Sequence, residues 1–113
     1  MPRQGVAALR VFLPLAVLGV LAGSGGAQAP KTIAQRDISF VPRTVSIKVG
    51  EQVVFRNDDP FGHNVYSPAQ ENIFDIGLQE PGTETPVTFS VPGEFTIQCR
   101  IHPKMRAKVT VTP

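Results

Sequence analysis

The chain has 113 residues, with 11 lysines and arginines against 9 aspartates and glutamates, and 42% of its residues are hydrophobic. This length suits a single small domain. Basic residues form no run and no aromatic side chains are interleaved with them, so nucleic-acid binding is excluded as the expected role.

The N-terminal segment has the layout of a secretory signal peptide. Arg3 and Arg10 give a basic start, residues 11–22 form a largely apolar run, and small residues follow up to Ala29. Cleavage is expected after Ala27 or Ala29. The apolar run is shorter than the ~20 residues that a membrane-spanning helix needs, so an uncleaved membrane anchor is the weaker alternative. We therefore expect a signal peptide over residues 1–29, a mature domain over residues 30–113, and export to the periplasm.

Loss of the signal peptide changes the charge of the protein. Arg3 and Arg10 are removed, which leaves 9 basic residues against 9 acidic ones, because every acidic residue lies beyond Ala29. The mature domain is then close to neutral. Its single cysteine, Cys99, cannot form an internal disulfide in an oxidising compartment, so this residue requires another explanation.

Beyond the signal peptide, short alternating segments are separated by turn residues, and none has the period of a helix. This spacing is typical of an all-β sandwich. About eight strands are expected, at residues 38–40, 45–49, 52–57, 64–67, 74–78, 87–91, 94–99 and 108–112.

The alternation over residues 94–99 predicts the direction of the cysteine side chain. Phe95, Ile97 and Cys99 share one face of this strand, and the two apolar residues must face the core. Cys99 is therefore expected to point inward at the end of its strand. His102 and Met105 follow within six residues, on the loop that leaves the strand.

Every Cys and His of the chain, and every Met other than the initiator, belongs to one set: His63, Cys99, His102 and Met105. A thiolate, two imidazoles and a thioether form the ligand set that copper prefers, with two His and one Cys in a plane and a weak axial Met. Zinc is a weaker alternative, because a thioether is not one of its usual ligands. All four positions come from the protein, so no open position for a substrate is expected, and this argues against an enzyme.

Simpler explanations exist for each residue alone. Cys99 could be a small buried hydrophobe, Met105 a filler of the core, and either histidine a surface or satisfied core residue. A nucleophilic Cys-His pair is less favoured, since the thiol is expected to point into the core and no oxyanion hole is evident.

Several further pieces of sequence join these residues in a resemblance to a known family. They are Phe40-Val-Pro42, Val49-Gly50, Val54-Phe55-Arg-Asn57, His63-Asn64-Val65, Phe74-Asp75, Pro92-Gly93-Glu-Phe95 and Cys99-Arg-Ile-His102-Pro103-Lys-Met105. Together they resemble the cupredoxins, the small blue type 1 copper proteins. The short ligand loop is most similar to that of the amicyanin and plastocyanin group, with the amicyanin spacing.

The resemblance implies an eight-stranded Greek-key β-sandwich that holds one Cu(II)/Cu(I) ion. His63, Cys99 and His102 would lie in the copper plane and Met105 would be axial. Asn64 would tie the two ligand loops together and help to hold the cysteine sulfur. His102 would be the partly exposed ligand through which electrons pass, within an apolar rim that contains Pro60, Phe61, Gly62 and Pro103.

The implied function is that of a monomeric one-electron carrier, not an enzyme, between periplasmic redox proteins. A c-type cytochrome or a dehydrogenase is the expected kind of donor or acceptor, and no membrane or nucleic-acid partner is expected. The alternative is a copper transport or storage module without an electron-transfer role.

The chain departs from the family in two respects. The lead before Ile38 is short, so the usual first strand is expected to be trimmed. Basic residues also cluster around the ligand loop, namely Arg100, Lys104, Arg106 and Lys108. This cluster suggests a partner that is acidic near its docking face, although Asp58 and Asp59 partly cancel the field, and the alternative is a merely solvated loop.

Overall fold

The computed structural model describes residues 29–113, and within this range the chain forms strands and no helix. The predicted signal peptide lies outside the described residues, apart from Ala29. No helix that could cross a membrane occurs in the described range. The strands are β1 (Lys31–Gln35), β2 (Phe40–Val41), β3 (Thr44–Lys48), β4 (Gln52–Asn57), β5 (His63–Ser67), β6 (Phe74–Gln79), β7 (Glu84–Thr88), β8 (Gly93–Gln98) and β9 (Arg106–Thr112).

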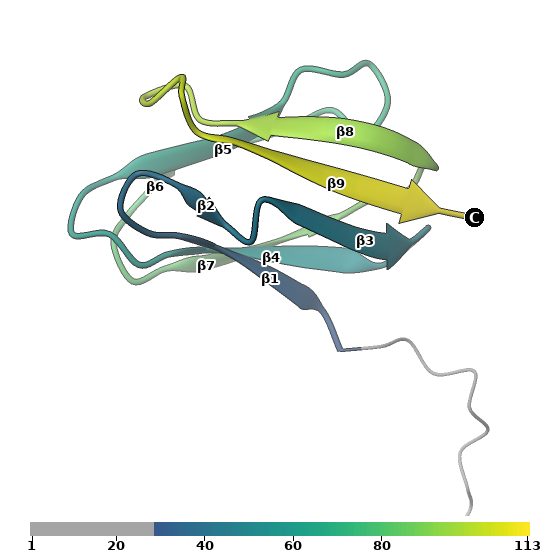
Figure 1. Ribbon diagram of the computed structural model, residues 1–113, viewed down its shortest axis with the longest axis horizontal. Coiled ribbons are helices and arrows are strands. Elements are labelled where there is room, and N and C mark those ends of the chain that lie inside the picture. Colours follow the sequence, from purple (N-terminus) through teal and green to yellow (C-terminus); the bar gives the residue numbers. More distant parts are fainter. Residues whose placement is uncertain (1–28) are drawn as a thin grey trace, which may run out of the picture.

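The strands form two sheets that pack face to face (Figure 1). One sheet has the order β2-β1-β4-β7 and the other the order β3-β9-β8-β5-β6. β1 runs parallel to β4, β3 runs parallel to β9, and the remaining pairs are antiparallel. The predicted all-β sandwich is therefore confirmed.

Residues that alternate along the strands fill the space between the sheets. Val53 and Phe55 of β4 belong to one buried cluster with Ile97 of β8, Val109 of β9 and Phe89. The rings of Phe74 and Phe89 meet edge to face, with 5.7 Å between their centroids. Such burial of apolar surface is the main contribution to the stability of a domain of this size.

The described part of the chain has nine strands, where the sequence predicted about eight, and the expectation of a trimmed first strand is wrong. β1 lies at Lys31–Gln35, where Ile33 is fully buried and the backbone pairs in register with Val53–Asn57. β1 does not alternate between buried and exposed residues, because the three consecutive residues Ile33, Ala34 and Gln35 are all buried. β1 is therefore identified by its backbone pairing with β4, which the sequence does not show.

Two other strands are shifted from their predicted positions. Of the strand predicted at residues 38–40, only Phe40 is in a strand, as the first residue of β2, because Asp37 and Ile38 have φ values of +52° and +56° and make a tight turn between β1 and β2. β7 ends at Thr88, before the predicted end at Val91. Phe89 still points into the core, but its backbone bonds the turn at Gly50 and Glu51.

The predicted metal ligands lie at two connections. His63 begins β5, directly after the loop that joins β4 to β5, and the other three lie on the loop that joins β8 to β9. In Figure 1 the β8–β9 loop lies at the end of the sandwich away from the C-terminus. β5 and β8 are neighbours in one sheet, with Tyr66 opposite Gln98, so His63 and Cys99 are brought together at this end.

Candidate metal centre

The structure brings three of the predicted ligands to one point. The ligand atoms of His63, Cys99 and His102 all lie within 4.8 Å of one another, close enough for a single ion to contact all three. His63 begins β5, Cys99 follows the last residue of β8, and His102 lies three residues further along the loop. The rings of the two histidines meet edge to face with 5.0 Å between centroids.

The burial of these residues matches what the strand pattern predicts. Cys99 points inward with Phe95 and Ile97, and His63 is fully buried. His102 is only partly buried, so it is the member of the group that reaches the surface. The fourth predicted ligand, Met105, is buried in the same core cluster, and its amide donates to the His102 carbonyl at 2.9 Å.

Two unpartnered nitrogens show that the residues fit a metal ion. The Nδ1 atoms of both His63 and His102 are buried and have no hydrogen-bond partner among the described residues. A buried polar atom without a partner costs about 1–3 kcal/mol, so such atoms normally have a reason to exist. Bonding a metal with Nδ1 would remove this cost for both rings. The Cys99 sulfur accepts one hydrogen bond, from the Asn64 amide at 3.3 Å.

The other ring nitrogen of His63 is held by Asp59. Nε2 lies 2.7 Å from Asp59 Oδ2, and both side chains are buried. Burial alone would raise the pKa of Asp59, but hydrogen bonds from His63 and from the Ile38 and Asp37 amides hold the pKa below its usual value. This carboxylate fixes the imidazole with Nδ1 directed toward the site, in the way that outer carboxylates orient metal-binding histidines.

The loop that carries His63 is itself pinned by Asn57, the last residue of β4. Its Nδ2 donates to the Phe61 and Gln79 carbonyls at 2.9 and 3.0 Å, and its Oδ1 accepts from the Asp59 amide at 2.9 Å. The side chain is fully buried. The Asn57 side chain therefore provides hydrogen-bond partners for backbone groups of the loop that follows β4, where pairing between strands has ended.

Asn64 and Asp75 connect the two ligand loops. Asn64 Oδ1 accepts from the Arg100 amide at 3.2 Å, beside Cys99, while its Nδ2 donates to Asp75 Oδ1 and to the Gly77 carbonyl, both at 2.8 Å. The Arg100 guanidinium donates to Asp75 Oδ2 at 2.8 Å and lies over the Tyr66 ring. The hydrogen bond from Arg100 is the largest of several effects that lower the pKa of Asp75 to about 2.

The surface around His102 is apolar. The Phe61 ring lies 5.3 Å from the His63 ring and 5.8 Å from the His102 ring, and 40% of Phe61 is exposed. Ile101, next to His102, is half exposed. Leu78 packs against Gly62 so closely that a Cβ atom added to Gly62 would lie 2.8 Å from Leu78 Cδ1. The predicted rim residues Pro60 and Pro103 are exposed as well.

The basic cluster near the ligand loop is smaller than the sequence suggests. Arg100 forms an ion pair with Asp75, and Lys108 lies 3.7 Å from Glu94. Asp58 forms ion pairs with Arg36 and Arg56, so its negative charge is offset by these two arginines and not by the basic residues of the ligand loop. Of the four predicted cations, Lys104 and Arg106 carry no ion pair with any residue in the range 29–113.

Sequence reasoning missed four residues of this site. Asp59 was expected only to offset the positive charge near the ligand loop, and Asp75 was named only as part of the matched piece Phe74-Asp75. Neither Leu78 nor Ile101 was placed in the apolar rim. The spacing of Asp59 four residues before His63 was the available signal for the first. Asp75 and Leu78 depend on the pairing of β6 with β5, which the sequence does not specify. Ile101 lies next to His102, and its apolar side chain on the ligand loop was the available signal.

The chain matches the family of copper-binding proteins described as the plastocyanin/azurin family, over residues 27–112. It is 34% identical to the chloroplast plastocyanin of Silene latifolia subsp. alba, over 89% of this chain and 70% of that protein. It is also 34% identical to the methylamine utilization protein MauL of Methylophilus methylotrophus, over 66% of this chain and 45% of that protein.

Solved structures of copper proteins have the same fold. A Cu-containing nitrite reductase from Thermus scotoductus superposes with a TM-score of 0.71 and 28% identity, but only 23% of that chain is matched by 78% of this one. A reduced Cu(I) form of an amicyanin mutant gives a TM-score of 0.68 at 24% identity, over 77% of this chain and 86% of that one. At this identity the amicyanin comparison supports the fold alone.

Proposed function

The chain belongs to the plastocyanin/azurin family of copper-binding proteins, the cupredoxins, and we propose that it carries single electrons between larger redox proteins. One copper ion is its cofactor. When bound, the ion accepts one electron as Cu(II) and returns it as Cu(I). The protein itself would not transform a substrate, because all the proposed ligands come from the chain and none leaves a position for one.

The observation that carries this proposal is the convergence of His63, Cys99 and His102 with two unpartnered Nδ1 atoms. We assign these three side chains as the copper ligands, in the His2Cys set that suits type 1 copper. Met105 would be a fourth, weaker ligand, since it is buried in the same core cluster as Cys99 and its backbone amide donates to the His102 carbonyl.

The residues around the ligands would hold the site in one geometry. Asp59 fixes the His63 ring, and Asn64 holds the cysteine loop through the Arg100 amide and the Cys99 sulfur. A site that changes little between two oxidation states has a small reorganisation to perform at each transfer. This favours rapid electron exchange over the release of copper.

Electrons would enter and leave through His102. It is the only one of the three grouped ligands that is not fully buried, and the apolar rim that contains Phe61, Leu78 and Ile101 surrounds it. A small apolar patch with few charges suits brief docking, because it excludes water at the point of contact without forming a tight complex.

We propose export to the periplasm, on the basis of the predicted signal peptide, and a monomeric state. The donor and acceptor would be redox proteins such as a c-type cytochrome or a dehydrogenase. The name of MauL links that relative to methylamine utilization. We do not extend that pathway to this protein, because nothing in its apolar rim identifies such a partner.

The experiment that tests the proposal is a titration of the purified mature protein with Cu(II), followed by visible absorption. An intense thiolate-to-copper charge-transfer band that saturates at one equivalent, and that disappears and returns through cycles of reduction and oxidation, supports the electron carrier. A pale protein that loses its copper to a weak chelator would instead indicate the transport or storage role.

A further inference from the structure

A small polar pocket lies between the ligand loop and the segment around β2. It has a volume of about 120 Å³ and is formed by two segments that are distant in the sequence, residues 39–43 and 104–106. Its lining residues are Ser39, Phe40, Arg43, Lys104, Met105 and Arg106. The volume corresponds to about four water molecules in the liquid, at ~30 Å³ each, so an ion of about five heavy atoms can be accommodated.

The charge of this pocket is not neutralised. Arg43, Lys104 and Arg106 all line it, and none of them forms an ion pair with the acidic residues, all of which lie in the described range. Four of the other cations of this range are paired, including the neighbouring Arg100 and Lys108. Three like charges around one cavity repel each other, and a bound anion would relieve this repulsion.

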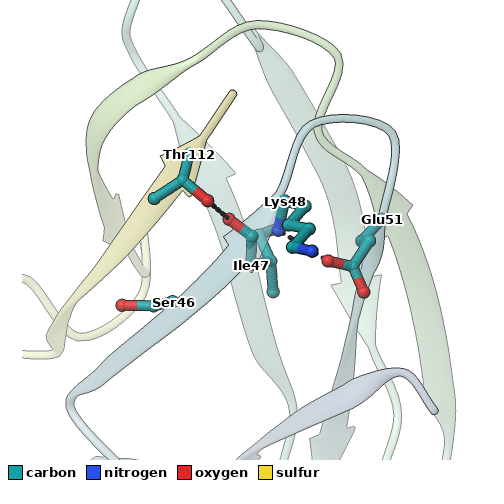
Figure 2. A pocket seen from close by; sticks show the side chains of 5 residues that line it. All are labelled: Ser46, Ile47, Lys48, Glu51 and Thr112. Atoms are coloured by element: carbon teal, nitrogen blue, oxygen red, sulfur yellow. Dashed lines mark hydrogen bonds between the residues drawn. The ribbon is translucent and has the colours of Figure 1, made fainter. Parts of the chain in front are cut away.

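A second surface pocket shows that this arrangement is not a general property of the molecule. It lies at the far end of the sandwich and is lined by Ser46, Ile47, Lys48, Glu51 and Thr112 (Figure 2). There one cation and one carboxylate share the pocket, and Glu51 accepts a hydrogen bond from the Lys48 amide at 2.6 Å. Within the lining of that pocket the positive charge of Lys48 is matched by the negative charge of Glu51.

We propose that the pocket between Arg43, Lys104 and Arg106 binds a small oxyanion, and that the bound anion lowers the reduction potential of the copper centre. Guanidinium groups bind phosphate and carboxylate oxygens with directed hydrogen bonds. Ser39 also lines the pocket, and its hydroxyl donates one long hydrogen bond of 3.5 Å, to the Asp37 carbonyl. A free phosphate ion and a carboxylate of a partner protein offer the same chemistry.

The effect on the potential follows from the position of Met105, which lines the pocket and whose amide is bonded to His102. A negative charge at this place stabilises Cu(II) relative to Cu(I). By linkage, the oxidised protein must then bind the anion more tightly than the reduced protein. A threefold difference in affinity corresponds to a fall of about 28 mV at saturation, since a one-electron couple moves 59 mV for each tenfold change. This second part of the inference rests on the proposed function, whereas the binding of the anion does not.

The test is calorimetric titration of the protein in a phosphate-free buffer of low ionic strength. Inorganic phosphate is the first probe and a tetraglutamate peptide is the second, each added to the copper-free and the copper-loaded protein. Arg43→Gln and Arg106→Gln should each weaken binding about tenfold, the range expected for loss of one charge-assisted hydrogen bond. Lys48→Gln removes the same charge at the other pocket and should change the affinity less than twofold.

The outcomes separate the two parts of the inference. Saturable binding of phosphate supports a site for a free ion, and binding of the peptide alone assigns the pocket to carboxylates of a partner. Binding of neither probe, or equal losses in Arg106→Gln and Lys48→Gln, overturns the site. Binding with a potential that does not change with phosphate overturns the coupling. A protein that binds phosphate but forms no copper centre would refute the proposed function and leave the anion site supported.

Discussion

Replacement of Asn64 by alanine tests whether the two ligand loops are held together as the structure indicates. The variant keeps the backbone bond to the Cys99 sulfur and loses three side-chain bonds, to the Arg100 amide, to Asp75 and to the Gly77 carbonyl. At about 0.5–1.5 kcal/mol each, with the bond to the carboxylate at the upper end, the loss is about 3 kcal/mol. For a domain of this size that is a fall in Tm of roughly 15 °C.

Asn72 provides a matched control at the other end of the β5–β6 hairpin. Its side chain also makes three hydrogen bonds, from Nδ2 to the Val91 carbonyl and from the Ser90 and Val91 amides to Oδ1. Its backbone has a φ of +52°, so Asn72→Gly is the suitable replacement because glycine tolerates this conformation.

Both variants should unfold at a lower urea concentration in the copper-free state, by similar amounts. Only Asn64→Ala should shift the charge-transfer band and weaken copper binding, because only its bonds position the cysteine loop. The reasoning is refuted if Asn64→Ala is as stable as the parent protein, or if Asn72→Gly changes the copper spectrum to the same extent.

Three further changes have defined outcomes. Asp59→Ala should weaken copper binding about 10–100-fold in competition with a chelator, since it frees the His63 ring; Asp58→Ala, whose carboxylate contacts only arginines, should not. The pKa of Asp75 falls from 3.8 to about 2 on folding, so its contribution to stability is complete above about pH 4 and is lost as the pH falls toward 2. The urea midpoint should therefore decline less steeply over this range in Asp75→Asn, and an unchanged slope would contradict the assignment. Leu78→Lys should slow electron self-exchange, measured by NMR line broadening, whereas Ile73→Lys should not. The two residues are similarly exposed, at 64% and 70%, but lie at opposite ends of one hairpin. Equal effects would contradict the role of the apolar rim in electron transfer.

The sequence was sufficient for those parts of the site that depend on strand alternation. Cys99 shares a face with Phe95 and Ile97, so its inward direction follows from a period of two, and the structure places it there. The limited supply of soft ligands identified His63 and His102 as its neighbours without any knowledge of the fold. These inferences needed only local pattern and composition.

Features that depend on tertiary pairing could not be predicted in the same way. β1 is defined by its parallel pairing with β4, and Asp59 is drawn inward by the amides of the Asp37–Ile38 turn, which only the structure reveals. Ile38 was expected in a strand because Ile38 and Phe40 alternate with polar residues, yet Ile38 has a φ of +56°. The carboxylate of Asp59 accepts from its amide and helps to hold this unfavourable conformation.

The central claim, that Cys99 is a copper ligand in a carrier of single electrons, is tested most directly by adding Cu(II) to Cys99→Ala and to the parent protein in parallel. The account predicts that the parent develops an intense charge-transfer band at one equivalent of copper. Cys99→Ala should have no such band, while its copper-free form remains folded by circular dichroism. An intense band that persists in the cysteine variant would contradict the account.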